Sequence, residues 1–200
     1  MMKNVLAARA LTLRILSALT VMLALALTGV AAQAQTFPPL TGRVVDAANI
    51  LSPATETALT AKLATLETQS QRQFVIATIP DLEGYEVSDY GYQLGRHWGI
   101  GDKERNDGVV LLIAPNERKM NISVGYGVEP VLTDAMSGSI IRNDITPKFK
   151  DGDFDGGVTA GADAIIRQLT LPPEEAQRIA AEAAADEESG DTIGMGIFGV

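Results

Sequence analysis

The sequence contains no cysteine and only one histidine among its 200 residues. Without cysteine, the chain has no disulfide bond, no thiolate metal site and no cysteine nucleophile. His97 stands alone, which excludes any metal site that takes two histidine ligands from one chain. Basic residues are also few, because 16 Lys and Arg stand against 25 Asp and Glu, a net charge of −9. This acid excess argues against a nucleic-acid partner, because phosphate backbones attract basic surfaces.

The first 34 residues have the layout of a secretory signal peptide. They carry three basic residues and no acid, and they include an apolar run over 15–27 and a small-x-small site from Ala32 to Ala34. We therefore predict cleavage after Ala34 and a protein that is periplasmic or secreted. Loss of the three basic residues would take the net charge from −9 to −12. The alternative is an uncleaved membrane anchor, since the uncharged stretch is nearly long enough to span a bilayer.

Hydrophobic spacing after the leader predicts alternating strands and helices. Continuous apolar runs predict buried strands over 74–79 and 109–114, and strict alternation predicts a half-exposed strand over 119–124. A shorter strand ends at Asp46, and Ser52-Pro53 is a typical helix start. Further helices are expected over 87–98, 133–143 and 157–169.

This order of elements indicates the fold class. The strand, helix and strand over 74–114 form a βαβ unit, whose strands are parallel by default, and the next strand returns as a hairpin. Helices before, between and after the strands predict an α/β protein, a three-layer α/β/α sandwich around a small mixed β-sheet. We assign this domain to residues 35–170.

Residues 171–200 are expected to form an acidic helical linker and a short apolar tail. Seven acids and one arginine lie between 171 and 191, around an alanine-rich centre that favours a solvated helix. The apolar stretch 192–200 is too short to span a bilayer. It is either a frayed tail or the stub of a membrane tether in a longer protein.

Several acidic residues stand in loops next to the predicted strands and helices. Asp46 ends the first strand, Asp107 precedes the third, Glu129 follows the fourth, and Asp134 opens a helix. Open α/β sheets place ligands at the ends of their strands, so we expect these carboxylates to meet at one edge. Oxygen ligands without histidine or thiolate suit Ca²⁺ or Mg²⁺. The simpler interpretation is that the acids cap turns and helices or pair with arginine.

The loops around these acids hold further candidates for binding. Lys103 and Arg105 can neutralise an anion such as a phosphate ester. Tyr126 lies between Gly125 and Gly127, where it would line a pocket or pack on its own loop. The two glycines predict a tight turn, since they lack the third glycine of a dinucleotide-binding motif.

Two other patterns are weaker. Residues 151–156 match the start of an EF-hand loop, but Ala162 stands where the bidentate glutamate is required, so a turn with Asp155 as helix N-cap is simpler. Ser137 and Ser139 lack the Gly-x-Ser-x-Gly elbow that would favour a serine hydrolase with His97.

Five short motifs occur in order and together resemble the TPM domain family. The resemblance runs from about residue 38 to residue 169. The motifs are Gly42-Arg43-Val44-Val45-Asp46-Ala47-Ala48-Asn49-Ile50-Leu51-Ser52, Trp98-Gly99-Ile100-Gly101, Asn106-Asp107-Gly108-Val109-Val110-Leu111-Leu112-Ile113, Gly125-Tyr126-Gly127-Val128-Glu129 and Leu132-Thr133-Asp134-Ala135.

The resemblance implies an α/β/α fold, divalent-cation binding and, for some members, acid phosphatase activity. Carried over position by position, it implies an acidic cluster of Asp46, Asp107, Glu129 and Asp134. Asn106 and Tyr126 lie inside the same motifs. The resulting hypothesis is a secreted domain that binds Ca²⁺ or Mg²⁺ and hydrolyses phosphomonoesters at a low rate. The alternative is a non-enzymatic assembly module, with a structural metal, for a protein complex of the cell envelope.

Overall fold

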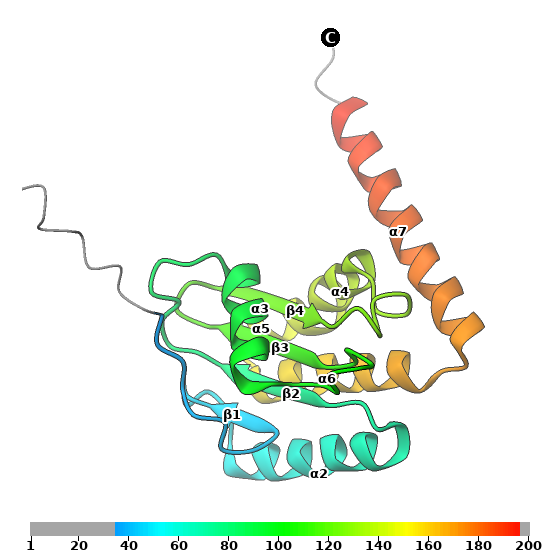
Figure 1. The fold of residues 1–200 in the computed structure, drawn as a ribbon. Coiled ribbons are helices and arrows are strands. Elements are labelled where there is room, and N and C mark those ends of the chain that lie inside the picture. The colour runs from blue at the N-terminus through cyan, green and yellow to red at the C-terminus, as the bar shows by residue number, and fades with distance from the viewer. Residues whose placement is uncertain (1–34, 197–200) are drawn as a thin grey trace, which may run out of the picture. The chain divides into compact units, whose positions relative to one another are not determined.

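The computed structural model describes residues 35–196, with side chains described up to residue 189. The predicted leader, residues 1–34, and the last four residues of the predicted apolar tail lie outside this range. From Phe37 onward the chain forms a compact unit of its own (Figure 1). Among the described residues, no helix combines the length and the apolar character needed to cross a membrane.

Four strands form one mixed sheet in the order β1-β2-β3-β4. They are β1 (Val44–Asp46), β2 (Phe74–Thr78), β3 (Val109–Ala114) and β4 (Lys119–Val124). The first three are parallel, and β4 returns antiparallel to β3 as the predicted hairpin. All residues of β2 and β3 are buried, which explains their continuous apolar sequence.

The helices surround this sheet, with bounds close to those predicted. They are α2 (Pro53–Ser70), α3 (Val87–Trp98), α4 (Asp134–Ile140), α5 (Thr146–Lys150), α6 (Phe154–Thr170) and α7 (Pro173–Gly196). Ser52 caps α2 as expected, because its hydroxyl accepts a hydrogen bond from the Thr55 amide. Between α4 and α5 lies a π-helical turn, Ile141–Ile145, so the predicted helix continues further than expected, to Lys150.

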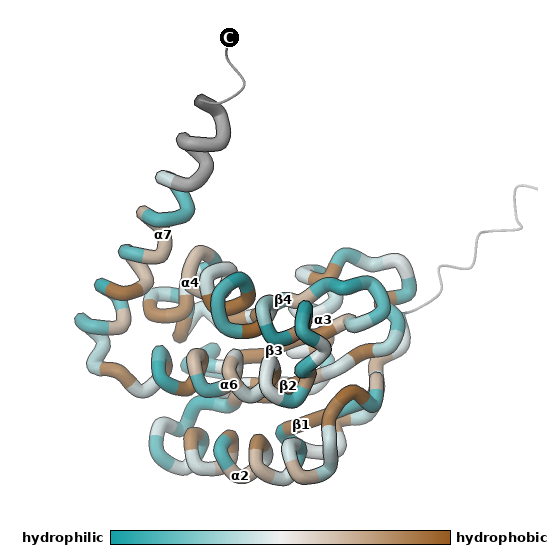
Figure 2. Tube along the Cα trace, turned by 180° about the vertical axis from the view of Figure 1, so that it is seen from behind, coloured by the Kyte–Doolittle hydropathy of each residue, from teal (hydrophilic) through white to brown (hydrophobic). Residues whose placement is uncertain are grey.

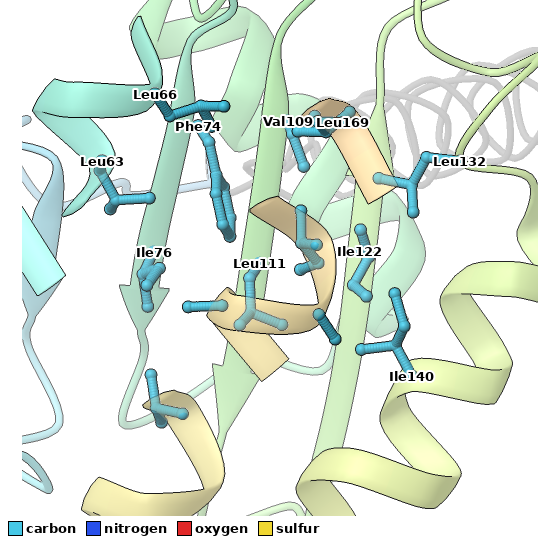
Figure 3. Packing of buried hydrophobic residues seen from close by; sticks show 14 of the residues in the cluster. Leu63, Leu66, Phe74, Ile76, Val109, Leu111, Ile122, Leu132, Ile140 and Leu169 are labelled. Atoms are coloured by element: carbon cyan, nitrogen blue, oxygen red, sulfur yellow. The ribbon is translucent and has the colours of Figure 1, made fainter. Parts of the chain in front are cut away.

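Two hydrophobic layers, one on each face of the sheet, confirm the α/β/α class. On one face, Leu63 and Leu66 of α2 pack with Ile76, Leu111 and residues of α4 and α6 (Figure 3). On the other face, Leu94 of α3 packs on alternate residues of β2 and β3. Because α3 is the helix that covers this second face, its fit against β4 shapes the surface described below (Figure 1).

The start of α6 corrects one prediction. Asp153, rather than Asp155, is the N-cap, and its carboxylate accepts from the Gly156 amide at 2.8 Å. Asp155 instead accepts a hydrogen bond from the Ser52 amide at 2.9 Å, which ties the start of α6 to the start of α2. That bond lowers the pKa of the Asp155 carboxyl.

Helix α7 occupies the acidic segment after residue 171. Figure 2 shows hydrophilic and hydrophobic residues alternating along it. Ala176 and Ala180 are buried, and the buried Gln168 side chain donates to the Ala176 carbonyl at 2.8 Å. The first turns of α7 therefore pack on the domain, while most of its acidic side chains are exposed.

Candidate functional site

A surface groove lies beside α3 and β4. Its volume is about 770 Å³. Its walls are α3, the loop 99–108, and the segment that leads from β4 to α4. Its lining mixes glycine and apolar residues with polar ones, and the polar ones are Ser88, Tyr92, Arg96, Asp102, Lys103, Asn106, Asn121, Ser123, Tyr126, Glu129 and Asp134.

Close packing of α3 on β4 creates the floor of this groove. A Cβ atom on Gly91 would lie 2.6 Å from the Ser123 hydroxyl and 3.3 Å from the Asn121 amide nitrogen. Only glycine at this position lets the helix approach the strand so closely. Asn121 donates to Ser123 at 2.8 Å, so the polar face of β4 lies directly against α3.

The loop before β3 is held together by its own side chains. Asp102 accepts hydrogen bonds from the amides of Arg105, at 3.0 Å, and Glu104, at 2.9 Å. These bonds lower the pKa of the Asp102 carboxyl. The loop therefore has a fixed shape at pH values at which Asp102 is ionised.

Asp107 is the buried anchor of this loop. One of its carboxylate oxygens accepts from the Asp102 amide at 3.0 Å, and the other accepts from the Arg105 Nε at 2.6 Å. Its side chain is only 7% exposed, whereas that of Arg105 is 49% exposed. The hydrogen bond to Asp107 raises the pKa of the Arg105 guanidinium. Both residues are therefore engaged within the protein, and neither lines the groove.

A close main-chain contact requires glycine on both sides of Tyr126, which agrees with the predicted tight turn. A side chain on Gly125 would collide with the Asn106 carbonyl, and one on Gly127 with the Arg105 carbonyl. The Gly127 amide donates to the Asn106 carbonyl at 2.8 Å. This close approach leaves the intervening Tyr126 side chain in solvent, where the residue is 77% exposed.

Asp46 lies at the opposite end of the sheet from Asp107. The parallel register places Asp46 beside Thr78, and Thr78 beside Ile113, whereas Asp107 precedes the first residue of β3. The separation along the strand is therefore about 20 Å. The expectation that the four acids meet at one edge is wrong for Asp46.

The Asp46 carboxylate already has a structural role at its own end. It accepts hydrogen bonds from the amides of Ile50, at 3.2 Å, and Leu51, at 2.9 Å, and from the Thr78 hydroxyl. These bonds fix the turn between β1 and α2. The simpler sequence interpretation, a capped turn, describes this residue, although its partners are amides and a hydroxyl rather than an arginine.

The groove brings together the remaining predicted residues. The lining includes Lys103, Asn106, Tyr126, Glu129 and Asp134, which are spread over about thirty positions of the sequence. In the described part of the chain, no three acidic or histidine side chains lie close enough to hold a metal ion by themselves. The groove therefore holds two of the four predicted acids, Glu129 and Asp134, and not the four-acid site.

Several groove residues were missed by sequence reasoning. Tyr92 is 53% exposed, and its hydroxyl accepts from Arg96 at 2.9 Å. Asn121 and Ser123 alternate with apolar residues, so they were interpreted only as the solvent face of a strand. The four-residue spacing of Gly91 and Gly95 on α3 was the available sign that this face packs closely against the sheet, with Gly91 on β4 and Gly95 on Val110 of β3.

The geometry gives no support to a Ser–His pair. The His97 ring packs on Phe37, with ring centroids 5.0 Å apart. Ser137 is buried on α4, and its hydroxyl makes no hydrogen bond to any described residue. The Ser139 hydroxyl accepts from Asn143 at 3.0 Å.

The protein belongs to the α/β/α class, and it carries a groove beside its antiparallel edge strand. Residues 44–168 match the TPM domain model, and the chain belongs to the TPM domain family. This match confirms the family suggested by the five motifs. A search of functionally curated proteins gave no match.

Solved structures agree with the fold. The N-terminal domain of a protein from Porphyromonas gingivalis is 29% identical, with a TM-score of 0.61, over 64% of this chain and 82% of that one. An N-terminal domain from Corynebacterium glutamicum is 18% identical, with a TM-score of 0.52, over 72% of this chain and 91% of that one. The BA42 protein of Bizionia argentinensis is 18% identical, with a TM-score of 0.52, over 62% of this chain and 92% of that one.

Proposed function

We propose that this TPM domain acts after export, in the periplasm or outside the cell, and binds Ca²⁺ or Mg²⁺ in the groove. The observation that carries the proposal is that Glu129, Asp134 and Asn106, from three separate motifs, line one cavity. Both carboxylates are exposed. Asp46 and Asp107 are left out, because hydrogen bonds within the protein engage their oxygens.

The donor set favours a cation that keeps part of its water. Glu129, Asp134 and Asn106 offer oxygen ligands only, which hard cations prefer. Mg²⁺ in particular retains several waters and binds proteins through one or two carboxylates. The net charge of −9 also favours cations near the surface.

Slow phosphomonoester hydrolysis is the enzymatic form of this proposal. A bound divalent cation supplies positive charge that polarises a phosphoryl group and acidifies bound water. Lys103 is the groove residue that can pair with a further ester oxygen, because Arg105 is bound to Asp107. The described groove contains no histidine or cysteine, so the chain itself supplies little acid–base or nucleophilic help.

A non-enzymatic assembly module for an envelope complex is the second candidate. Tyr92 and Tyr126 are exposed at the groove and carry large surfaces with a polar tip, which are common in protein interfaces. In this case the cation would stabilise the segment between β4 and α4 for contact with a partner. Activity toward a phosphomonoester separates the two candidates.

The test is thermal unfolding of residues 35–200 after chelation, with Ca²⁺ or Mg²⁺ added back. Binding to the native state alone adds about 2.7 kcal/mol of stability at a hundredfold excess over Kd. We expect a rise in Tm for the parent chain and none for the double variant Glu129→Gln, Asp134→Asn. Glu104→Gln is the matched control, because Glu104 is exposed but does not line the groove. No rise with either cation would overturn the proposal.

Hydrolysis of p-nitrophenyl phosphate, measured with the cation that raises Tm, distinguishes the two forms. A rate that the double variant abolishes supports the phosphatase form. Cation binding without turnover supports the assembly module.

A further inference from the structure

The outer edge of β4 borders the groove. Among residues 35–196, strand β4 pairs with β3 alone, on its other side. The groove is lined by the consecutive residues 121–126, which include both faces of the strand. A cavity that touches both faces in succession runs along the strand edge rather than over one face.

The hydrogen-bond pattern shows which main-chain groups point outward. The Gly125 amide donates to the Gly108 carbonyl at 2.8 Å, in register with the β3–β4 ladder. In an antiparallel pair, bonded and non-bonded positions alternate along each strand. Met120, Ile122 and Val124 therefore direct their N–H and C=O groups away from β3. Within residues 35–196, no hydrogen bond to these groups is found.

The opposite edge of the sheet differs. Strand β1 has only three residues, and very short edge strands are a common protection against unwanted pairing. Strand β4 has six residues and no proline. Its edge therefore has the length and the unpaired groups needed to accept another strand.

The surroundings of the edge indicate what kind of strand fits. Three carboxylates line the groove, and Glu129 and Asp134 lie beyond the Val124 end of β4. The two basic residues of the lining are Arg96, which donates to the Tyr92 hydroxyl, and Lys103. Tyr92 and Tyr126 offer exposed rings at the groove. Basic side chains complement these carboxylates, and the chain's charge of −9 opposes a second copy on average.

We propose that the β4 edge binds an extended segment of a partner protein as a fifth strand, with a lysine or arginine of that segment paired to Glu129 or Asp134. Main-chain hydrogen bonds to Met120, Ile122 and Val124 would fix the register of the bound segment against β4. The acidic end of the groove supplies the preference for basic sequence. This inference does not require a bound cation.

A defined heptapeptide tests the proposal. The probe alternates valine and threonine and carries lysine at both ends, and its binding to residues 35–200 is measured by fluorescence polarisation in the presence of EDTA. The matched peptide carries glutamate in place of lysine. We expect the lysine peptide to bind at least about tenfold more tightly, since like charges across an interface are costly. Equal binding of both peptides, or binding of neither, would overturn the proposal.

Single N-methylation of the lysine peptide tests strand addition directly. Each methyl group removes one main-chain donor. Strand pairing predicts a period of two, with about tenfold weaker binding at alternate positions and little change between them. Losses without this period would show that the peptide does not bind as a strand.

Variants of Val124 locate the site. Val124→Pro removes an outward donor while leaving the ladder to β3 intact, because proline is tolerated where the N–H faces away from a sheet. We expect about tenfold weaker peptide binding with a cooperative unfolding transition retained. Val124→Ala keeps the N–H and should bind like the parent. If sedimentation instead shows a dimer that Val124→Pro dissociates, the occupant is a second copy and the partner proposal fails.

Discussion

Two pairs of carboxylates in this domain have similar sequence contexts and different surroundings. Asp46 and Asp107 adjoin strands and accept hydrogen bonds from neighbouring groups on both oxygens. Glu129 and Asp134 lie in the segment between β4 and α4, are exposed, and line the groove. The difference teaches that an acid next to a strand becomes a candidate ligand only when the fold leaves its oxygens accessible.

The same comparison separates stability from binding. Removing a carboxylate from the first pair leaves amides or a guanidinium without an acceptor, which costs folding free energy. Removing one from the second pair leaves no buried partner behind. The two pairs should therefore respond in opposite ways to stability and ligand measurements.

Asp107→Ala should have the largest effect on stability. The change leaves the Asp102 amide and the Arg105 guanidinium without their acceptor, and it opens a cavity under the loop. Loss of the acceptor shared by a backbone amide and a guanidinium costs about 3 kcal/mol, near the upper end for hydrogen bonds that involve a charged group. Urea unfolding of residues 35–200 measures this. A loss below about 0.5 kcal/mol, the range of ordinary surface changes, would contradict the structural role.

Gly125→Ala should destabilise the loop contact next. The new methyl group would collide with the Asn106 carbonyl, so the segments 105–108 and 125–127 would have to separate. Overpacking of this kind costs about 2 kcal/mol. The matched control is Gly42→Ala, where the nearest atom lies 4.0 Å from the new Cβ. Equal losses for the two variants would argue against the close approach.

Asp46→Ala should cost about 2 kcal/mol, since amides of the β1–α2 turn lose their acceptor. Asp46→Asn should recover part of this loss, because an amide oxygen still accepts one hydrogen bond. The readout is the urea midpoint, together with cation binding by each variant. If Asp46→Ala abolished cation binding while the fold persisted, the assignment of Asp46 to structure alone would be wrong.

Most of the fold could be predicted from the sequence. Burial produces a pattern of apolar residues that can be identified in the sequence. Examples are the apolar runs of β2 and β3, the alternation in β4 and the leucine spacing of α2. The helix N-caps were less certain. Asp153 and Asp155 stand two residues apart at the start of α6, and only the structure shows that Asp153 is the cap while Asp155 contacts Ser52.

The site could be predicted only in part. The glycines at 125 and 127 predicted a tight turn, but they did not show that its main chain lies against the Asn106 carbonyl. The motifs could not show that Asp46 lies at the far end of the sheet, since this depends on the parallel register. Nor could they show that Arg105 pairs with Asp107, because a hydrogen bond between two loop side chains produces no repeating pattern in the sequence.

The double variant Glu129→Gln, Asp134→Asn should leave stability without cation nearly unchanged, within about 0.5 kcal/mol. Its effect should appear only in binding, as loss of the cation-dependent rise in Tm. Calorimetric titration of both chains with Ca²⁺ and Mg²⁺ provides a second measurement. A large loss of stability in the chelated protein would place these acids with Asp46 and Asp107 instead.

The smallest expected effect concerns pH and Asp102. Its pKa lies below the ordinary value of 3.8, because the amides of Arg105 and Glu104 donate to its ionised form. A carboxyl whose pKa is lowered on folding stabilises the native state above its unfolded pKa, and this stabilisation is lost as pH falls through the folded value. Unfolding free energy should therefore decline below about pH 4, and Asp102→Asn should flatten that decline. Because Asp102 is solvent-accessible, the change should be smaller than that of Asp107→Ala, and an unchanged pH slope in Asp102→Asn would assign the acid sensitivity to other carboxyls.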